Sequence, residues 1–441
     1  MYLERKIEVY LNQWAKVPNR RPLLLRGARQ VGKSTLIEQW GARFFEKTIV
    51  INFEQYPKYK EAFKELDPQK ILDVLSLLSN QPIQEGSHLL FLDEIQECPQ
   101  AITALRYFFE QKPGLHVIGA GSSLEMALQS DSIKVPVGRI EYLYLYPFSF
   151  EEFLKAIGEN LLMNHLAEVD FDHPPALPVH EKLLSLLTQF FFLGGMPAVV
   201  EEYVRTKDLL RCKQLQHDIL TTYNQDFGKY HRLAKKECLE AVLNAMPSLV
   251  GNKLVYAKVS TDHTALELKK AIGLLEGVGI LHRVFQSTAR QVPLAAGKKE
   301  KFYKTLFLDI GLLQSMSGLG AEILNPDKIM DTHRGALAEQ FVGQGLLHLF
   351  QGEEPQLYYW FREAKSSSAE VDYLWAHQGQ IYPVEVKSGK SGSLKSLNLI
   401  LKEYDLPRGI RFSQKPLQRE GLLVSIPLYL VGQLPRLLQV G

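Results

Sequence analysis

Cysteine is scarce in this sequence, because only Cys98, Cys212 and Cys238 occur among the 441 residues. The three are far apart and odd in number, so the sequence offers neither the spacing of a zinc site nor a disulfide framework. This is typical of a reducing compartment. No apolar run reaches the length that spans a membrane, and residues 1–6 contain no apolar signal core. We therefore expect a cytoplasmic protein without a membrane partner.

The sequence also lacks an excess of positive or negative charge. The 51 Lys and Arg residues nearly balance the 49 Asp and Glu residues, which leaves a net charge of +2. No global field therefore points to a nucleic-acid partner, although a local basic face remains open. Hydrophobic residues make up 46% of the chain and charged residues 23%, as in ordinary globular proteins. The length suggests about three domains.

The main motif is an apolar run, a glycine loop and a helical pattern in residues 22–35. The loop has the spacing G-x-x-x-x-G-K-S, which is that of a phosphate-binding P-loop. Its glycines let backbone N–H groups turn toward a phosphate, and the following helix points its positive end at the same anion. We expect Lys33 to reach the β- and γ-phosphates of ATP and Ser34 to hold Mg²⁺. A chance glycine loop is disfavoured because the flanking strand and helix are both indicated. The predicted nucleotide-binding residues are Gly27, Ala28, Arg29, Gln30, Val31, Gly32, Lys33, Ser34 and Thr35.

A second motif is the apolar run of residues 88–92, followed by Asp93 and Glu94. The pattern predicts a buried parallel strand with two carboxylates at its C-terminal end, where parallel α/β sheets bind ligands. Asp93 is expected to hold Mg²⁺, and Glu94 to act as the base that polarises the attacking water. An acidic loop after a strand is the alternative, and the intact P-loop upstream disfavours it.

Two further candidates for the same site are weaker. Residues 116–123 read as a buried strand that ends in Ser122 and Ser123, either of which is a candidate γ-phosphate sensor. A helix N-cap by Ser123 is an equally good interpretation. Arg139, at the start of another predicted strand, is a candidate cation for the transition state, but a surface salt bridge is slightly preferred.

These motifs together resemble a known family. Residues 26–34, 92–96, 121–124 and 147–153, with the Gly194-Gly195-Met196-Pro197 turn, closely resemble the prokaryotic AAA-type ATPases (AAA_14) that carry a C-terminal DUF4143 region. The resemblance spans nearly the whole chain. The P-loop alone is generic, and the ordered series of motifs makes the resemblance specific.

Residues 181–231 are helical in pattern and are predicted to form the lid of the ATPase. In residues 232–320, helices precede two predicted strands whose intervening polar segment holds Arg290 and Lys298, Lys299 and Lys301. This pattern suggests a winged helix, which the family resemblance also implies. Lys269, Lys270 and the cluster at Lys298 would then contact DNA. A packing module between two larger domains is an equally supported alternative.

The C-terminal residues 325–441 begin with a linker at residues 325–327. A helix with Glu339, a strand with Asp372 and a strand with Glu385-x-Lys387 follow in the order of a PD-(D/E)XK-type nuclease. The three carboxylates would bind Mg²⁺, and Lys387 would orient or activate water near the scissile phosphate. A turn at residues 378–380 predicts a hairpin that brings Asp372 close to Glu385. An inactive fold used for docking is the alternative.

The predicted fold class is α/β: a parallel-sheet P-loop ATPase domain with a helical lid, a winged-helix-like module, and a C-terminal restriction-endonuclease-like domain. The predicted function is ATP hydrolysis that controls engagement or cleavage of DNA. The alternative is a nucleotide-switched interaction protein whose C-terminal domain docks a partner without chemistry. ATP and Mg²⁺ are the expected cofactors, and DNA and further copies of the chain are the candidate partners. The predicted domains are residues 1–180, 181–231, 232–320 and 325–441.

Overall fold

The computed structural model describes residues 2–122, 124, 138–230, 233–318, 326–350, 352–364, 367–389 and 393–439, and the side chains of 326–334, 363, 364 and 367 are not among the described parts. The chain divides into two compact units. Unit 1 consists of Met1–Pro147, Gly277–Ile280 and Gln351–Glu354, and unit 2 consists of Phe148–Glu276, Leu281–Phe350 and Pro355–Gly441. The predicted ATPase domain, residues 1–180, extends past Pro147 into unit 2.

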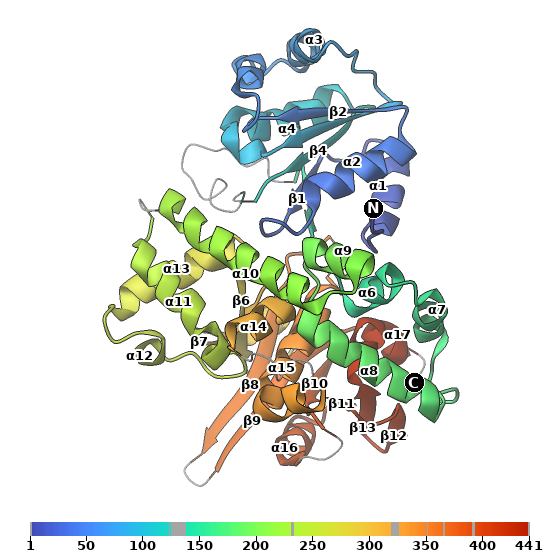
Figure 1. Ribbon diagram of the computed structural model, residues 1–441, viewed down its shortest axis with the longest axis vertical. Coiled ribbons are helices and arrows are strands. Elements are labelled where there is room, and N and C mark those ends of the chain that lie inside the picture. Colours follow the sequence, from blue (N-terminus) through green and yellow to red (C-terminus); the bar gives the residue numbers. More distant parts are fainter. Residues whose placement is uncertain are drawn as a thin grey trace. The chain divides into compact units, whose positions relative to one another are not determined.

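Unit 1 contains a five-stranded sheet in the order β2-β3-β4-β1-β5, and every pairing is parallel (Figure 1). This confirms the predicted parallel-sheet α/β fold. The apolar composition of the central strands fits their burial, since all residues of β3 and β4 are buried. The strands are β1 (Leu23–Arg26), β2 (Lys47–Asn52), β3 (His88–Asp93), β4 (His116–Ala120) and β5 (Glu141–Tyr144).

Helices and short 3₁₀ turns connect these strands. The start of α3 shows how the local sequence sets an element: Asp67 accepts hydrogen bonds from the backbone N–H groups of Gln69 and Lys70, and Pro68 occupies the first turn. The same helix ends at Asn80, which adopts the left-handed conformation. The helices of unit 1 are α1 (Glu8–Lys16), α2 (Lys33–Phe44), η1 (Pro57–Phe63), α3 (Pro68–Ser79), η2 (Ile95–Glu97) and α4 (Pro99–Gln111).

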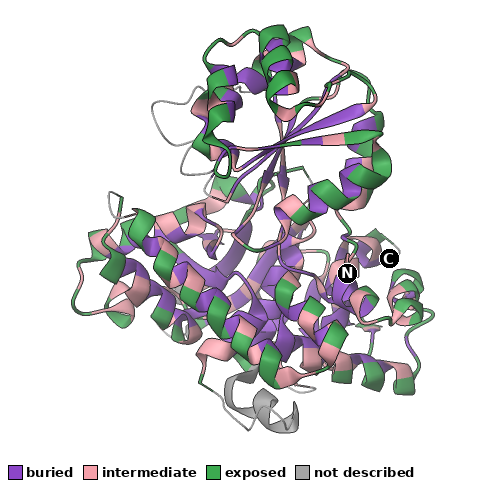
Figure 2. Cartoon of the chain, turned by 45° about the horizontal axis from the view of Figure 1, so that its top comes forward, coloured by how far each residue is buried: buried purple, intermediate pink, exposed green. Residues whose placement is uncertain are grey.

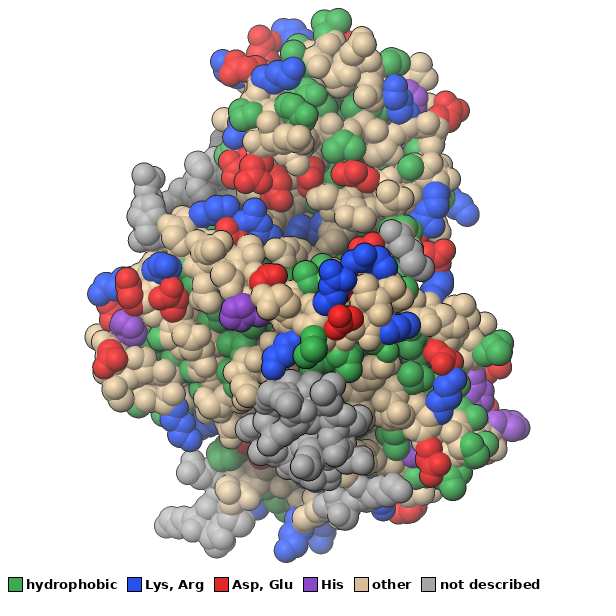
Figure 3. Space-filling view, viewed as in Figure 1, with side chains coloured by type: hydrophobic (Ala, Val, Ile, Leu, Met, Phe, Trp, Pro, Cys, Tyr) green, Lys and Arg blue, Asp and Glu red, His purple; other side chains and the backbone are tan. Residues whose placement is uncertain are grey.

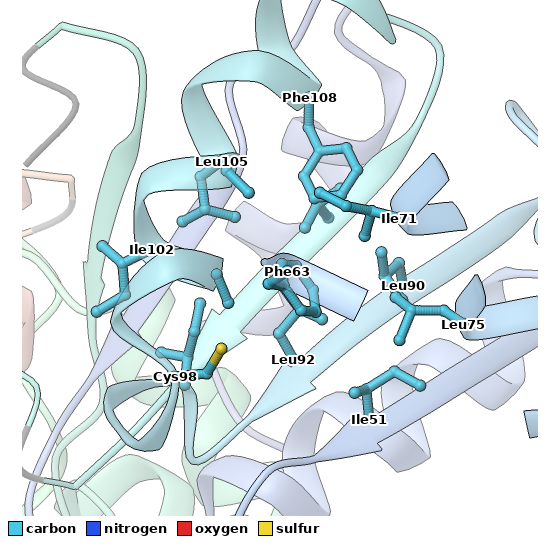
Figure 4. Packing of buried hydrophobic residues seen from close by; sticks show 14 of the residues in the cluster. Ile51, Phe63, Ile71, Leu75, Leu90, Leu92, Cys98, Ile102, Leu105 and Phe108 are labelled. Carbon is cyan, nitrogen blue, oxygen red and sulfur yellow. The ribbon is translucent and has the colours of Figure 1, made fainter. Parts of the chain in front are cut away.

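The core of unit 1 lies between one face of the sheet and the elements η1, α3 and α4 (Figure 4). Figure 2 shows the same pattern over the chain, with buried strands and helices exposed on their outer faces. Burying each large apolar side chain contributes about 1.5–3 kcal/mol, so this cluster fixes the strands that carry the motifs. Its labelled members in Figure 4 are Ile51, Phe63, Ile71, Leu75, Leu90, Leu92, Cys98, Ile102, Leu105 and Phe108.

Unit 2 contains an eight-stranded mixed sheet in the order β12-β13-β11-β10-β9-β8-β6-β7. The predicted hairpin around Gln378 and Gly379 is confirmed, because β9 and β10 pair antiparallel on either side of these two residues. The strands are β6 (Leu281–Ser287), β7 (Lys298–Phe307), β8 (Leu357–Ala364), β9 (Ser367–His377), β10 (Gln380–Val386), β11 (Gly409–Ser413), β12 (Gln418–Glu420) and β13 (Leu423–Pro427).

The hairpin predicted as the wing of a separate module belongs to this sheet. Strands β6 and β7 pair antiparallel, and β6 also pairs in parallel with β8. The C-terminal strands and the predicted wing are therefore hydrogen-bonded within one sheet. The sequence instead predicts two separate modules, the first of which ends at residue 320. Lys298, Lys299 and Lys301 lie on β7 itself rather than in the segment between the strands.

The helices of unit 2 precede, connect and flank this sheet. The predicted interruption of the lid helices is confirmed, because α8 ends at Leu193 and α9 starts at Pro197. The expected linker is wrong at Pro326 and Asp327, which begin α15; Asn325 lies outside the described residues. The helices are α6 (Phe150–Ala156), α7 (Asn160–Glu168), α8 (Leu177–Leu193), α9 (Pro197–Thr206), α10 (Leu209–Asp226), η3 (Phe227–Tyr230), α11 (Lys236–Leu249), α12 (Tyr256–Val259), α13 (Ala265–Gly277), η4 (Leu294–Gly297), α14 (Ile310–Met316), α15 (Pro326–Leu347), α16 (Lys395–Tyr404), η6 (Leu428–Gln433) and α17 (Leu434–Gln439).

The Gly194-Gly195 turn has a steric reason for its glycines. A Cβ atom on Gly195 would lie 2.2 Å from the carbonyl oxygen of Phe148, whose own N–H donates to the carbonyl of Gly195 at 2.6 Å. Gly194 has a φ of +70°, and its added Cβ would lie 2.1 Å from Asp309 Oδ1. The buried Asp309 accepts from the N–H groups of Gly195 and Leu312 at 2.7 and 3.0 Å. The motif is thus explained by close packing inside unit 2.

Among the described residues, no helix is both long enough and apolar enough to cross a membrane.

Candidate nucleotide-binding site

The phosphate loop lies between β1, which ends at Arg26, and α2, which begins at Lys33. Gly32 is the N-cap of α2 with a φ of +91°, and Gln30 has a φ of +66°. Gly27 has a φ of +151°, and a Cβ atom there would lie 2.3 Å from the carbonyl oxygen of Leu145. The two motif glycines are therefore required by backbone conformation and close approach, and the loop leads directly into a helix N-terminus.

Lys33 is a buried cation at this loop. Its Nζ donates hydrogen bonds to the carbonyl oxygens of Gly27 and Ala28, at 2.9 and 2.8 Å. Burial lowers the pKa of Lys33 to about 8, although the carboxylates of Glu94 and Asp93 act in the opposite direction. The ammonium group is thus held within the loop by backbone carbonyls, close enough to both carboxylates to interact with them.

Ser34 and Asp93 come together from different elements. The hydroxyl of Ser34 lies 3.0 Å from each carboxylate oxygen of Asp93, and Asn52 Nδ2 donates to Asp93 Oδ2 at 3.0 Å. Burial raises the pKa of Asp93, while the hydrogen bond from Ser34 acts in the opposite direction. A hydroxyl and a carboxylate are the hard oxygen donors that Mg²⁺ prefers, so this pair fits the predicted metal role.

Glu94 follows Asp93 at the carboxyl end of β3 in the left-handed conformation, with a φ of +48°. Its Oε2 accepts a hydrogen bond from Gln96 Nε2 at 2.6 Å. The Gln96 amide in turn lies where a side chain at Gly121 would be, because an added Cβ would be 1.9 Å from Gln96 Oε1. Gln96, which follows β3, therefore packs directly against Gly121, which follows β4.

The candidate sensor Ser122 follows a central strand of the unit 1 sheet. β4 lies between β1 and β3, and Ser122 follows the carboxyl end of β4. Ser122 is half-buried, and its contact with a nucleotide stays a prediction. Ser123 lies outside the described residues.

Arg139 lies at the other end of the strands. β5 begins after it, and Glu141 of β5 pairs with Leu23 at the start of β1, whereas the phosphate loop follows the end of β1. Arg139 is exposed, and its Nε lies 3.1 Å from Glu110 Oε1. The slightly preferred interpretation, a surface ion pair, agrees with this placement. A role for Arg139 at the phosphates of its own chain does not.

Sequence patterns did not single out two residues that contact the site. Arg5 is buried and donates to the carbonyl oxygens of Val31 in the phosphate loop and of Tyr146, at 3.1 and 2.6 Å. Asn52, the last residue of β2, holds Asp93 as described above. A polar residue at the C-terminal end of a parallel strand is a signal that could have found Asn52. For Arg5 the sequence gives no such signal.

The predicted C-terminal carboxylates lie within unit 2 around a lysine. Lys304 Nζ lies 2.9 Å from Glu339 Oε1 and 3.7 Å from Asp372 Oδ1, and it also forms an ion pair with Glu370. Burial raises the pKa of Glu339 to about 7, while Lys304 acts to lower it. Sequence analysis did not single out Lys304 or Glu370.

Glu385 is paired with a second lysine. Lys387 Nζ donates to Glu385 Oε1 at 2.5 Å, and Asp372 Oδ2 accepts from the N–H of Val386 at 2.7 Å. Burial and the neighbouring Asp372 raise the pKa of Glu385 to about 7. The predicted approach of Asp372 and Glu385 is thus present. However, the described residues contain no group of three or more His, Cys, Asp or Glu side chains that could hold a metal ion. The three-carboxylate Mg²⁺ site stays a prediction, and Lys304 lies among the carboxylates of this centre.

Comparison with protein families agrees with the motifs. Residues 19–154 match the family described as an AAA domain, and they include the phosphate loop, Asp93 and Glu94. The chain thus contains an AAA domain with the P-loop ATPase fold. Residues 334–429 match a domain of unknown function, DUF4143, and residues 184–323 match another, DUF8612. The DUF8612 match covers most of the predicted lid and extends just past the predicted winged-helix-like module.

No curated protein matches this chain. Among solved structures, the Walker-type ATPase PABY2304 of Pyrococcus abyssi is 15% identical with a TM-score of 0.45, over 72% of this chain and 96% of that chain. The Aeropyrum pernix ORC1 protein in complex with DNA is 15% identical with a TM-score of 0.26, over 71% and 92%. The Thermotoga maritima RuvB Holliday junction branch migration motor is 15% identical with a TM-score of 0.31, over 63% and 88%. All three TM-scores are below 0.5, and these likenesses therefore carry no information on function.

Proposed function

We propose that this protein binds and hydrolyses Mg²⁺-ATP at the carboxyl edge of the unit 1 sheet. The observation that carries the proposal is the Ser34 hydroxyl 3.0 Å from both carboxylate oxygens of Asp93, directly beside the phosphate loop. Loop, hydroxyl and carboxylate are the parts that phosphoryl transfer requires for positioning and charge neutralisation.

Each residue has a separate task in this proposal. The loop N–H groups and the N-terminus of α2 bind phosphate oxygens, and Lys33 turns from its carbonyl partners toward the β- and γ-phosphates. Ser34 and Asp93 hold Mg²⁺, which offsets charge on the same phosphates. Glu94 accepts the proton of the attacking water, and its hydrogen bond to Gln96 holds it in place until then.

The proposal is tested by the metal dependence of ATP turnover. We expect phosphate release to stop on chelation of divalent cations and to return on addition of Mg²⁺. Ser34→Ala is expected to raise the Mg²⁺ concentration needed for half-maximal turnover, because one oxygen donor is removed. Ser79→Ala is the matched control, since the hydroxyl of Ser79 donates to the carbonyl of Leu75 within its own helix α3. Turnover that persists in chelator would contradict the proposal.

For the C-terminal sheet we favour the non-catalytic alternative, in which it docks a partner under control of the nucleotide state. Support comes from Lys304, which already neutralises carboxylates that a metal-dependent nuclease would need free. No reaction is assigned to Glu339, Asp372, Glu385 or Lys387.

DNA is the second candidate partner, and exposed lysines favour it. Lys269 and Lys270 on α13 and Lys299 and Lys301 on β7 are all exposed. Against it, acidic and basic side chains are interspersed over the face drawn in Figure 3, and the net charge is only +2. DNA binding would therefore depend on a local patch of basic side chains.

We expect binding of double-stranded DNA, if these lysines contact phosphates, to weaken with salt. Replacing both Lys269 and Lys270 by Glu should reduce the slope of log affinity against log salt by roughly two, one for each lost phosphate contact. Fluorescence anisotropy with a labelled duplex measures this. Lys402→Glu, a change of the exposed lysine on α16, is the control. An unchanged slope in the double variant would remove DNA as a partner of this helix.

A further inference from the structure

Among the described residues of unit 2, Lys304 is the most completely buried cation that faces acidic side chains. It lies on β7, only 2% of its side chain is exposed, and its ammonium group contacts carboxylates from two other elements. Glu339 belongs to α15, whereas Glu370 and Asp372 belong to β9, two residues apart and hence on one face of the strand. Side chains from three elements thus meet at the Nζ atom of Lys304.

Three carboxylates surround the ammonium group of this lysine. Its Nζ lies 2.9 Å from Glu339 Oε1 and 3.7 Å from Asp372 Oδ1, and it also pairs with Glu370. A buried ion pair of this kind requires the charged form of the lysine. An ammonium group is a point charge that donates hydrogen bonds and has no lone pair for a metal. A charged Lys304 and a divalent cation would therefore repel each other among the same oxygen atoms.

The remaining groups of the centre have partners that leave little room for a cation. Lys387 pairs with Glu385 Oε1, and the N–H of Val386 donates to Asp372 Oδ2. Glu385 Oε2 is buried and has no hydrogen-bond partner in the described part of the chain. A Mg²⁺ ion at this centre would therefore have to compete with Lys304, Lys387 and the N–H of Val386 for the carboxylate oxygens that it needs as ligands.

We propose that the ammonium group of Lys304 permanently takes the place of a divalent cation among Glu339, Glu370 and Asp372, so that this centre is a metal-independent ion cluster. It ties the β6–β7 hairpin to α15 and β9. The carboxylate arrangement that resembles a nuclease site is thereby used for cohesion of unit 2. The proposal does not depend on the ATPase function.

The proposal predicts that removing the lysine creates a metal site. With Lys304→Met the side chain keeps much of its volume and loses its charge, which leaves Glu339, Glu370 and Asp372 without their cation. Glu385 Oε2 is then a further available donor. We expect the full-length Lys304→Met protein to bind one more Mn²⁺ per chain than wild type and to gain thermal stability with added Mn²⁺.

The experiment is a titration of nucleotide-free protein with Mn²⁺, followed by electron paramagnetic resonance of the free ion. Binding at Ser34 and Asp93 is common to every variant, so the comparison cancels it. We expect the extra ion to disappear in Lys304→Met/Asp372→Asn. Lys387→Met is the matched control and should gain no ion, because Lys304 remains in place.

Two results would overturn the proposal. One is a wild-type protein that loses a bound Mn²⁺ on Asp372→Asn, which would show a metal site despite Lys304. The other is a folded Lys304→Met protein that gains none. If Lys304→Met does not fold, as judged by circular dichroism, the comparison of wild type with Asp372→Asn still decides, and equal Mn²⁺ binding by the two supports the proposal.

Discussion

Lys33→Ala is expected to lower ATP turnover by at least ~10²–10³-fold, the usual effect of losing one preorganised group that stabilises transition-state charge. The buried ammonium lies between the carbonyls of Gly27 and Ala28, inside the loop that would hold the phosphates. Its loss removes the positive charge opposite the β- and γ-phosphates, so nucleotide affinity should fall as well. Phosphate release and binding of a fluorescent ATP analogue measure the two effects.

The control for this change is Lys47→Ala. Lys47 is exposed at the start of β2, the end of the sheet away from the phosphate loop. It should leave turnover unchanged, and both variants should keep the melting temperature close to that of wild type. Normal binding and hydrolysis in a folded Lys33→Ala protein would contradict the assignment of the loop.

Glu94→Gln is expected to separate binding from hydrolysis. The amide keeps the size of the carboxylate but cannot accept the proton of the attacking water, so hydrolysis should fall ~10²–10⁴-fold, the range for a general base. ATP binding should stay within a few-fold of wild type, because Lys33, Ser34 and Asp93 are untouched. Single-turnover hydrolysis and equilibrium nucleotide binding give the two quantities.

Glu97→Gln is the control, because it makes the same substitution three residues further along the chain. Glu97 is exposed and pairs with Lys60 at 3.5 Å, so its change should affect neither quantity. A Glu94→Gln protein that hydrolyses ATP at the wild-type rate would refute the role as base. One that fails to bind nucleotide would show that Glu94 supports the site rather than the chemistry.

The fold around the phosphate loop was predictable because its motifs are local. The P-loop needs a strand, a glycine loop and a helix in direct succession, and residues 23–44 form them in that order. Asp93 and Glu94 come at the end of a strand, and parallel pairing brings such strand ends to one edge of a sheet. Asn52 reaches Asp93 for the same reason, since β2 and β3 are neighbours.

The position of Arg139 in the fold could not be predicted from the local sequence. Its position before a strand is visible in the sequence, but the end of the sheet at which it lies depends on the pairing of β5 with β1. That pairing places it beside Glu110 and away from the phosphate loop. Arg5 is the reverse case, because a residue 26 positions before Val31 becomes a support of the loop only through folding.

The sequence by itself determined the parallel-sheet ATPase fold and the loop that would hold ATP, since both follow from short contiguous patterns. Only the tertiary structure decided that the β6–β7 hairpin joins the C-terminal sheet and that Lys304 lies among Glu339, Glu370 and Asp372. Lys304 and Glu339 are 35 positions apart on different elements. A contact of that kind depends on strand order and helix packing, which no local spacing encodes. The same carboxylates therefore predict a metal site in sequence and surround an ammonium group in the fold.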